Sequence, residues 1–459
     1  MESGLGGRVA MGADARFFNL VEGASWPDVR KLKLDRLLAQ LRYVQARSVF
    51  YQRKFAAAGL DIAKIGSLED VPLLPFTEKA ELRASLQEAP LLGLHRAAPL
   101  DRIVQIQASS GTTGSPAYVG LTKRDQYVWQ ETGARCLYAN GVRPGDLAMH
   151  GFSVSRGFVG GLPMSQIVLH LGAIEIPIGA DAGTERILRV MQDLRPQALL
   201  ATPYFAIHLG EQAPRIVGVE ARTLGVRVVS VGGEPGGGIP AVREKIEALW
   251  GATCLELCGG TDLGCAYWAE CDEKRGMHET AQEFIYVELI NPDTGDVLPW
   301  QEGTTGELVY TALDRECSPL VRFRTRDHAV VTGLACGCGR TAPTIRVFGR
   351  TDDMLIVKGI NVFPSAVRDV VTGFEPRTTG NLRIVADFPG YTTQRPLRIK
   401  VEYGAGLAGD GGAIERLRQE IGERLRGLLN FAPAVEMVPP DTFEKPGIHK
   451  IALIVRDDG

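Results

Sequence analysis

A run of small hydroxyl residues and glycines has the composition of an anion-binding loop. Residues 107–116 read QASSGTTGSP, directly after the apolar run IVQI. Backbone N–H groups beside glycine, together with serine and threonine hydroxyls, form a nest for phosphate oxygens. A Walker loop would require the lysine of GxxxxGK[ST], and none stands here. The sequence therefore predicts phosphate binding, with a flexible glycine–serine turn as the alternative. The residues concerned are Ser109, Ser110, Gly111, Thr112, Thr113 and Gly114.

Three cysteines and one histidine have the types and spacing of a metal site. Cys271 and His278 are seven residues apart, and Cys336 and Cys338 follow in the segment CGCGR. Three thiolates and one imidazole make the closed tetrahedral donor set of structural Zn²⁺. Unliganded loop thiols are the alternative, because CxC is tighter than the usual CxxC. We predict that zinc joins these two segments, and we assign no thiol as a nucleophile.

Two kinds of β-structure must position these residues. From about residue 100 to 260, short apolar runs alternate with helical patterns, which is typical of parallel β-α-β layers. From about 284 to 350, apolar runs are separated by turn residues, which predicts antiparallel hairpins. Leucines at helical spacing over 27–58 predict one amphipathic N-terminal helix. The expected fold is α/β: a large N-terminal domain, residues 1–350, and a small α+β domain, residues 351–459.

The composition excludes several classes of protein. The 459 residues contain 51 Lys+Arg and 54 Asp+Glu, a formal net charge of −3, so a general nucleic-acid binder is not expected. No apolar run reaches the roughly 18–20 residues that cross a bilayer. The first residues lack the pattern of a signal peptide. We expect a cytoplasmic protein without nucleic-acid or membrane partners.

Several segments, in this order, resemble the adenylate-forming (acyl-CoA synthetase-like) superfamily and, within it, the phenylacetate–CoA ligase family. They are LPFTEKAELR at 74–83, SSGTTGSP at 109–116, VGGEP at 231–235, LCGGTDLG at 257–264, GELVYTALDRECSPLVRFRTRD at 306–327 and CGCGRTAPTIRVFGRTDDMLIVKGINVFPSAV at 336–367, followed by Lys450. The resemblance implies that a carboxylate attacks the α-phosphate of ATP to give an acyl adenylate and pyrophosphate. A thiol, usually that of CoA, then displaces AMP. Such catalysis depends on positioning and charge neutralisation.

The resemblance also implies nucleotide-binding roles. The hydroxyl loop would cradle the β- and γ-phosphates, Thr261 would donate to the α-phosphate, and Asp262 would hold Mg²⁺. Asp262 departs from the family's usual glutamate, and Cys258 stands where an aromatic residue is usual. Asp327 would accept hydrogen bonds from the ribose hydroxyls, and Arg350 would help to hold the ribose or phosphate. The remaining nucleotide-binding positions are Gly233, Glu234, Pro235 and Gly260.

Two further roles belong to the small domain, which the resemblance makes a mobile lid. Asp352 matches the hinge about which it swings. Lys450 matches the catalytic lysine that bridges the substrate carboxylate and the nucleotide, although His449 replaces the usual glycine and Lys445 is a competitor. For the acid, aromatic side chains and glycine backbone favour a flat aromatic guest. The residues expected there are Phe152, Ser153, Phe158, Gly232 and Gly259.

The sequence thus predicts an aryl-acid–CoA ligase that acts on a phenylacetate-like or benzoate-like acid. Its expected cofactors are ATP, Mg²⁺, coenzyme A and structural Zn²⁺, and a homodimer is expected by analogy with the family. One alternative is adenylation followed by transfer to the phosphopantetheine of an acyl carrier protein or to an amine. A second is a non-catalytic nucleotide-binding module with the same fold.

Overall fold

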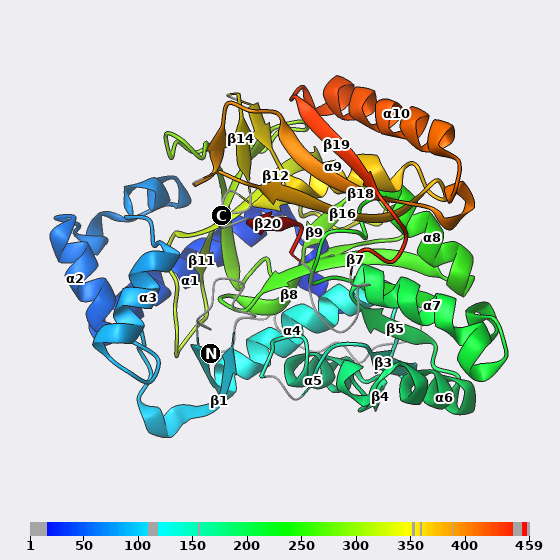
Figure 1. Cartoon of the computed structure of the whole chain (residues 1–459). Helices are drawn as coiled ribbons and strands as arrows, with labels where there is room; N and C mark the ends of the chain where they lie inside the picture. Colours follow the sequence, from blue (N-terminus) through cyan, green and yellow to red (C-terminus); the bar gives the residue numbers. More distant parts are fainter. Residues whose placement is uncertain are drawn as a thin grey trace.

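The computed structural model describes residues 16–108, 118–154, 157–350, 354–358, 360–388, 390–443 and 452–456. These residues form a mixed sheet of eleven strands, a two-stranded ribbon and, from residue 354 onward, a second body with sheets of three and four strands (Figure 1). The α-helices are α1 Trp26–Arg47, α2 Val49–Ala57, α3 Lys79–Glu88, α4 Lys123–Ala139, α5 Leu162–Leu171, α6 Thr184–Leu194, α7 Pro203–Val217, α8 Pro240–Trp250, α9 Pro364–Thr372 and α10 Gly411–Leu429.

The strands follow two connection patterns, parallel in the first half of the large sheet and antiparallel in the second. They are β1 Ile103–Ala108, β2 Tyr118–Thr122, β3 Leu147–His150, β4 Ile174–Ile176, β5 Ala198–Ala201, β6 Val228–Val231, β7 Thr253–Gly260, β8 Gly264–Glu270, β9 Met277–Glu279, β10 Ile285–Ile290, β11 Thr305–Ala312, β12 Phe323–Gly333, β13 Thr344–Arg350, β14 Leu355–Val357, β15 Ile360–Val362, β16 Thr378–Ala386, β17 Thr392–Thr393, β18 Leu397–Tyr403, β19 Pro433–Val438 and β20 Ile454–Arg456.

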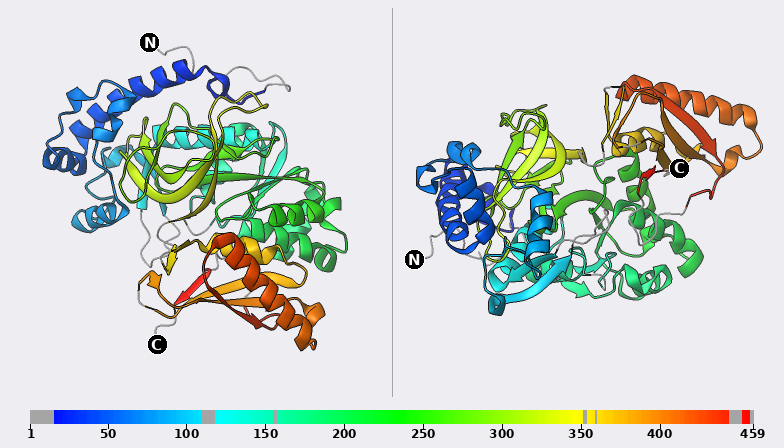
Figure 2. Two further views of the ribbon diagram at one scale, coloured as in Figure 1. Left: turned by 90° about the horizontal axis from the view of Figure 1, so that it is seen from above. Right: turned by 60° about the vertical axis from the view of Figure 1, so that its left-hand side comes forward.

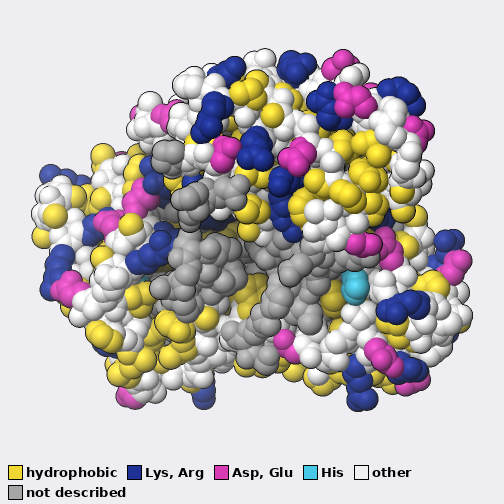
Figure 3. Space-filling view, viewed as in Figure 1, with side chains coloured by type: hydrophobic (Ala, Val, Ile, Leu, Met, Phe, Trp, Pro, Cys, Tyr) yellow, Lys and Arg dark blue, Asp and Glu magenta, His cyan; other side chains and the backbone are white. Residues whose placement is uncertain are grey.

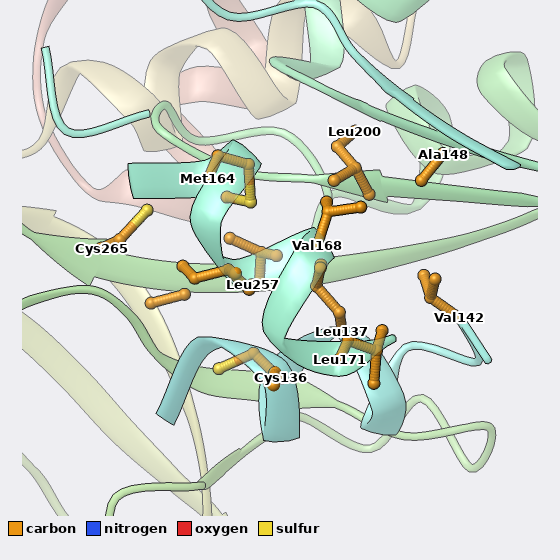
Figure 4. Packing of buried hydrophobic residues seen from close by; sticks show 14 of the residues in the cluster. Cys136, Leu137, Val142, Ala148, Met164, Val168, Leu171, Leu200, Leu257 and Cys265 are labelled. Atoms are coloured by element: carbon orange, nitrogen blue, oxygen red, sulfur yellow. The ribbon is translucent and has the colours of Figure 1, made fainter. Parts of the chain in front are cut away.

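The parallel half confirms the predicted β-α-β layers. Strands β4, β3, β5, β6 and β7 lie side by side in parallel register, and every residue of β5 and β6 is buried. Strands covered by helices on both faces are apolar along their whole length, which is the pattern of these two strands. Leu137 of α4, Val168 of α5 and Leu200 of β5 pack together on one face of this sheet (Figure 4).

The strand β1 does not belong to the parallel sheet, contrary to the prediction. It pairs antiparallel with β2 in a separate ribbon. Its alternation explains why: Val104 and Ile106 are exposed, whereas Gln107 is buried on the other face. A strand with glutamine on its inner face and one face in solvent suits an antiparallel ribbon better than a doubly covered parallel sheet.

The antiparallel half confirms the predicted hairpins. Beyond β7 the sheet continues as β8, β9, β13, β12, β11 and β10, with each neighbouring pair antiparallel. The N-terminal helix differs from the prediction, because it is divided at Ser48 into α1 and α2. The side chain of Ser48 caps α2 by accepting a hydrogen bond from the N–H of Tyr51.

The second body contains β16, β18, β19 and β20 in one sheet, with α9 and α10 beside it. Figure 2 shows this C-terminal body, from yellow-orange to red, on one side of the large sheet. The predicted boundary at residue 351 falls at 351–353, outside the described residues, and stays a prediction. Within the described parts of the chain, no helix is both long and apolar enough to cross a membrane. Charges of both signs are interspersed on the face in Figure 3.

Candidate functional site

The hairpin between β7 and β8 carries Thr261 and Asp262. Its turn is closed by a hydrogen bond from the N–H of Leu263 to the carbonyl of Gly260, at 3.0 Å. Thr261 is buried and Asp262 is half-buried. Gly259 packs so tightly that an added Cβ would lie 2.0 Å from the carbonyl oxygen of Cys265, so only glycine fits there. The turn is therefore held close against β8.

Asp327 and Arg350 stand directly opposite each other on the antiparallel strands β12 and β13. Arg350 Nη1 donates to Asp327 Oδ1 at 2.9 Å. The side chains of Asp327 and Arg350 are 24% and 34% exposed, respectively. The sheet register thus brings together two residues that are 23 positions apart in the sequence, and leaves both of them partly accessible.

A buried tyrosine connects the hairpin turn with this ion pair. Burial, and then the negative groups of Cys258, Asp327 and Asp262, raise the pKa of Tyr267 well above its usual value, while Arg350 lowers it. The phenol therefore stays protonated, and both carboxylates act electrostatically on it. Sequence reasoning missed Tyr267, because a tyrosine in a buried strand carries no signal that separates it from core packing.

Glycines and phenylalanines form a second part of the site, after β6 and β3. Gly233 has a φ of +84°, which favours glycine, and a Cβ there would lie 3.9 Å from Phe152 Cε1. A Cβ on Gly160 would meet the rings of both Phe158 and Phe152, at 2.6 and 3.1 Å. The predicted acid-binding residues Phe152 and Phe158 thus lie close together beside glycine backbone, whereas Gly232, next to Gly233, packs against Leu257 of β7. Glu234 is half-buried and Pro235 is exposed.

The polar groups beside Phe152 are largely engaged within the protein. Ser153 Oγ lies 2.8 Å from both carboxylate oxygens of Asp181 and donates to that carboxylate. His150 Nε2 lies 2.9 Å from Ser165 Oγ. Because the hydroxyl of Ser153 already donates to Asp181, Ser153 has no free proton to donate to a substrate in this arrangement.

The predicted phosphate loop begins where β1 meets the Phe158 segment. The N–H of Ala108 donates to the carbonyl of Gly157 at 2.9 Å, and Ala108 forms a bridge with Phe158. Residues Ser109–Gly114, the hinge residue Asp352 and the lysine Lys450 lie outside the described residues. Their roles stay predictions.

The four predicted metal ligands do come together. Their ligand atoms all lie within 4.8 Å of one another. Cys271 Sγ is 3.6 Å from Cys336 Sγ and 3.7 Å from His278 Nε2, and Cys338 Sγ is 3.5 Å from the same nitrogen. His278 Nδ1 lies 2.9 Å from the carbonyl oxygen of Ala342, so a proton on Nδ1 leaves the Nε2 lone pair facing the thiols. We call these residues the Cys/His cluster.

The C-terminal body packs directly on the strands of the site. Phe363, just before α9, contacts the rings of His328 on β12 and Phe348 on β13, with centroids 5.2 and 5.3 Å apart. The Arg368 guanidinium lies over the ring of Tyr204, 4.6 Å from its centroid. The Phe363 contacts join the second body to β12 and β13, which carry Asp327 and Arg350, and the Arg368 contact joins it to α7.

Comparison with known proteins agrees with this arrangement. Residues 25–312 match the AMP-binding enzyme family, and residues 359–455 match the AMP-binding enzyme C-terminal domain. The phenylacetate-coenzyme A ligase of Thermus thermophilus is 34% identical over 426 residues, which cover 90% of this chain and 93% of that protein.

Two solved structures of 2-hydroxyisobutyryl-CoA ligase also resemble this chain. The postadenylation state in complex with R3-HIB-AMP has a TM-score of 0.89 at 27% identity, covering 98% of this chain and 94% of that one. The thioesterification state with 2-HIB-AMP and CoA has a TM-score of 0.72 at 28% identity, over the same shares of the two chains.

The fold and these matches define an adenylate-forming enzyme. The chain belongs to the AMP-binding enzyme family and, within it, to the phenylacetate–CoA ligase family. The matches support ATP-dependent ligation of an acid to CoA with formation of AMP.

Proposed function

We propose that this protein is an AMP-forming aryl-CoA ligase. The observation that carries the proposal is that two sets of residues lie at the ends of inner strands of one sheet. The turn that carries Thr261 and Asp262 joins β7 to β8, and Asp327 pairs with Arg350 across β12 and β13. Asp262, Asp327 and Arg350 all act electrostatically on the phenol of Tyr267. Phe152, Phe158 and glycine backbone lie beside the neighbouring strand β6. A nucleotide and a flat acid would meet between these sets.

The nucleotide-binding residues divide the work of adenylation. Asp327 presents carboxylate oxygens to the ribose hydroxyls, and its orientation is fixed by the hydrogen bond from Arg350. Thr261 donates to the α-phosphate oxygen on which negative charge develops. The carboxylate of Asp262, half-buried on its turn, fits the oxygen ligands that Mg²⁺ prefers and would hold that ion. Bound Mg²⁺ would supply neutralising charge to the phosphates.

Four further roles rest on the family resemblance. Ser109–Gly114 hold the β- and γ-phosphates. The remaining nucleotide-binding positions are Gly233, Glu234, Pro235 and Gly260. Lys450 bridges the substrate carboxylate and the nucleotide in the adenylating pose. Asp352 is the hinge between the two poses.

The acid is proposed to be aromatic, of the phenylacetate or benzoate type. The rings of Phe152 and Phe158 lie next to glycine backbone, and such a wall favours stacking of a flat ring. The relatives named phenylacetate-coenzyme A ligase support the same class of acid. A small hydroxy acid, as named for the solved structures, is the competitor to include in a test.

The relative placement of the two bodies is proposed to be that of a state after adenylation. The TM-score is 0.89 with the postadenylation structure and 0.72 with the thioesterification structure, although the shares of chain covered are equal. The contacts of Phe363 with His328 and of Arg368 with Tyr204 then belong to this pose. They must be broken when the C-terminal body turns for thioester formation.

We propose that the Cys/His cluster holds structural Zn²⁺. Tetrahedral zinc has Zn–S distances of about 2.3 Å and Zn–N distances of about 2.0–2.1 Å, which places neighbouring ligand atoms roughly 3.6–3.8 Å apart. Three of the six ligand-to-ligand distances in the cluster are 3.5, 3.6 and 3.7 Å, and all six are at most 4.8 Å. The donor set is closed, because four protein ligands leave no position for substrate, and therefore indicates a structural role.

An ATP–pyrophosphate exchange assay tests the proposed function. The panel contains phenylacetate, benzoate, ring-substituted analogues and 2-hydroxyisobutyrate, followed by a thioester readout with CoA, dephospho-CoA and a phosphopantetheinylated carrier protein. We expect exchange with an aryl acid and thioester formation with CoA. Exchange only with the hydroxy acid would reject the aromatic class, and transfer only to the carrier protein would favour the biosynthetic alternative. No exchange with any acid would favour a non-catalytic module.

Sedimentation of the same sample tests the expected homodimer.

A further inference from the structure

A buried arginine with incomplete hydrogen bonding lies behind the Thr261–Asp262 turn. Arg315 stands in the loop between β11 and β12 and is only 4% exposed. Its Nη1 donates to the carbonyl oxygen of Leu263, the residue after Asp262, at 3.4 Å. Its Nε and Nη2 have no hydrogen-bond acceptor among the described residues. Burial of a guanidinium with unpaired N–H groups costs free energy, so this position suggests a functional demand.

The backbone of Arg315 is fixed by α1. The side-chain amide of Gln40 donates to the carbonyl of Arg315 at 2.8 Å and accepts from its N–H at 3.0 Å. Gln40 is itself buried. A side-chain amide that pairs with both backbone groups of one residue leaves that residue little freedom to rotate.

The side chain of Arg315 is directed by α4. Its Nε lies 3.6 Å from Asp125 Oδ1, which also accepts from the N–H of Glu316 at 2.7 Å. Its guanidinium lies over the ring of Trp129, 5.0 Å from the centroid. Trp129 in turn reaches the same hairpin, since its Nε1 lies 3.8 Å from where a Cβ on Gly264 would be. Residues of α1 and α4 thus hold Arg315 so that its guanidinium contacts the carbonyl of Leu263.

We propose that Arg315 is a positioning residue for adenylation. By holding the Leu263 carbonyl, it sets the direction in which the short turn presents Thr261 to the α-phosphate and Asp262 to Mg²⁺. A rotation of the peptide group between Leu263 and Gly264 would shift the turn and with it that carboxylate, and a misplacement of about 1 Å can cost on the order of 100-fold in rate. This inference rests on the proposed function, because it needs those roles for the turn.

The test compares Arg315→Met and Arg315→Lys with Arg322→Met. Arg322 is the matched control, since it is a buried arginine nearby whose guanidinium is fully engaged by Glu288 and by the carbonyls of Pro72 and Leu74. The readouts are pyrophosphate exchange against Mg²⁺ concentration, calorimetric binding of Mg·ATP without acid, thioester formation from supplied acyl adenylate, and melting temperature.

We expect Arg315→Met to lower exchange by about 10- to 100-fold, to weaken Mg·ATP binding and to raise the Mg²⁺ concentration for half-saturation. Thioester formation from supplied acyl adenylate should stay close to the wild-type rate. Arg315→Lys should recover part of the loss, and Arg322→Met should lower only the melting temperature.

Unchanged Mg²⁺ half-saturation and Mg·ATP affinity in folded Arg315→Met would overturn the inference. If that variant does not fold, a lowered exchange rate in Arg315→Lys with wild-type values for both quantities would overturn it equally. Absence of exchange in the wild-type enzyme would instead reject the proposed function, so the two failures are distinguishable.

Discussion

Strands β8 and β13 each have the proposed nucleotide-binding residues at one end and the Cys/His cluster at the other. β8 begins at Gly264, beside the Thr261–Asp262 turn, and ends at Glu270, directly before Cys271. β13 begins at Thr344, soon after the cysteine loop, and ends at Arg350. The short strand β9, which contains His278, pairs with both strands at the cysteine end. One pair of strands therefore joins the proposed nucleotide end to the Cys/His cluster.

The nucleotide end is proposed to bind substrate, whereas the cluster end is proposed to stabilise the sheet. At the nucleotide end, Asp327 and Arg350 are partly exposed and held by a hydrogen bond, so they can exchange partners with a ligand. At the cluster end, Cys271 and His278 are buried and four ligand atoms face one another. A metal that fixes one end of the strands leaves the other end free to adapt without loss of the sheet. Substitutions at the two ends should have opposite effects on rate and stability.

The largest effect is expected for Lys450→Ala, which removes the cation proposed to bridge the substrate carboxylate and the nucleotide. Adenylation should fall by about 100- to 1,000-fold, since preorganised charge at a developing oxyanion is worth that much. Thioester formation from supplied acyl adenylate should stay largely intact, and the two half-reactions are measured separately. Lys445→Ala is the control and should change neither. Equal loss of both half-reactions in Lys450→Ala would refute its role.

Asp327→Asn should have the next largest effect. The amide cannot accept hydrogen bonds from both ribose hydroxyls and loses its charge-assisted bond with Arg350. Pyrophosphate exchange should fall by on the order of 100-fold, while the melting temperature changes by no more than in Asp387→Asn, a surface control in the second body. A large fall in melting temperature with a normal rate per folded molecule would place Asp327 among structural residues.

Cys338→Ser should give the opposite pattern. Loss of one of four ligands should release the metal and lower the melting temperature by several degrees, because metal binding is coupled to folding. Exchange per folded molecule should stay within about twofold at a temperature where the sheet is intact. Elemental analysis should find one zinc per wild-type chain and less in the variant. Cys254→Ser, at a buried cysteine outside the cluster, controls for loss of a thiol. An unaltered melting temperature and a metal-free wild type would reject the zinc.

The smallest effect concerns Glu256, which stands between the two ends on β7. Burial, and then repulsion by Glu270, raise the pKa of Glu256 to about 7. Because the folded protein favours the protonated form of Glu256, this carboxyl group contributes its full stability below the pKa that it has in the unfolded chain. That contribution is lost as the pH rises through 7. Glu256→Gln should therefore increase the urea midpoint at pH 8.5 and leave it unchanged at pH 4. A variant that is less stable at pH 8.5 would show that the charged form is the favoured one.

The sequence predicted the parts of the site that depend on residue type and order. The Cys/His cluster was predicted because three cysteines and a histidine in two short segments are typical of a metal site. The halves of the large sheet were found because buried parallel strands and hairpins differ in their apolar pattern. Motif order gave the family, and register then placed Asp327 opposite Arg350.

Other features depend on tertiary packing, which no local pattern reports. β1 has the apolar composition of an inner strand, but glutamine faces inward and the strand forms a ribbon. Ser48 divides the N-terminal helix because its hydroxyl caps α2. Sequence reasoning missed Tyr267 and Arg315, because a tyrosine in a strand and an arginine in a loop are common and form part of no recognisable motif. Their importance depends on Asp262 and Leu263, which come near them only in the folded chain.

A crystal structure with a non-hydrolysable acyl-adenylate analogue, an aryl sulfamoyl adenosine, would locate both the nucleotide and the acid. We expect the ribose hydroxyls on the carboxylate of Asp327, the phosphate mimic beside Thr261, and the aryl ring between Phe152, Phe158 and the Gly232–Gly233 backbone. A nucleotide bound elsewhere, with no contact to the carboxylate of Asp327, would contradict this assignment.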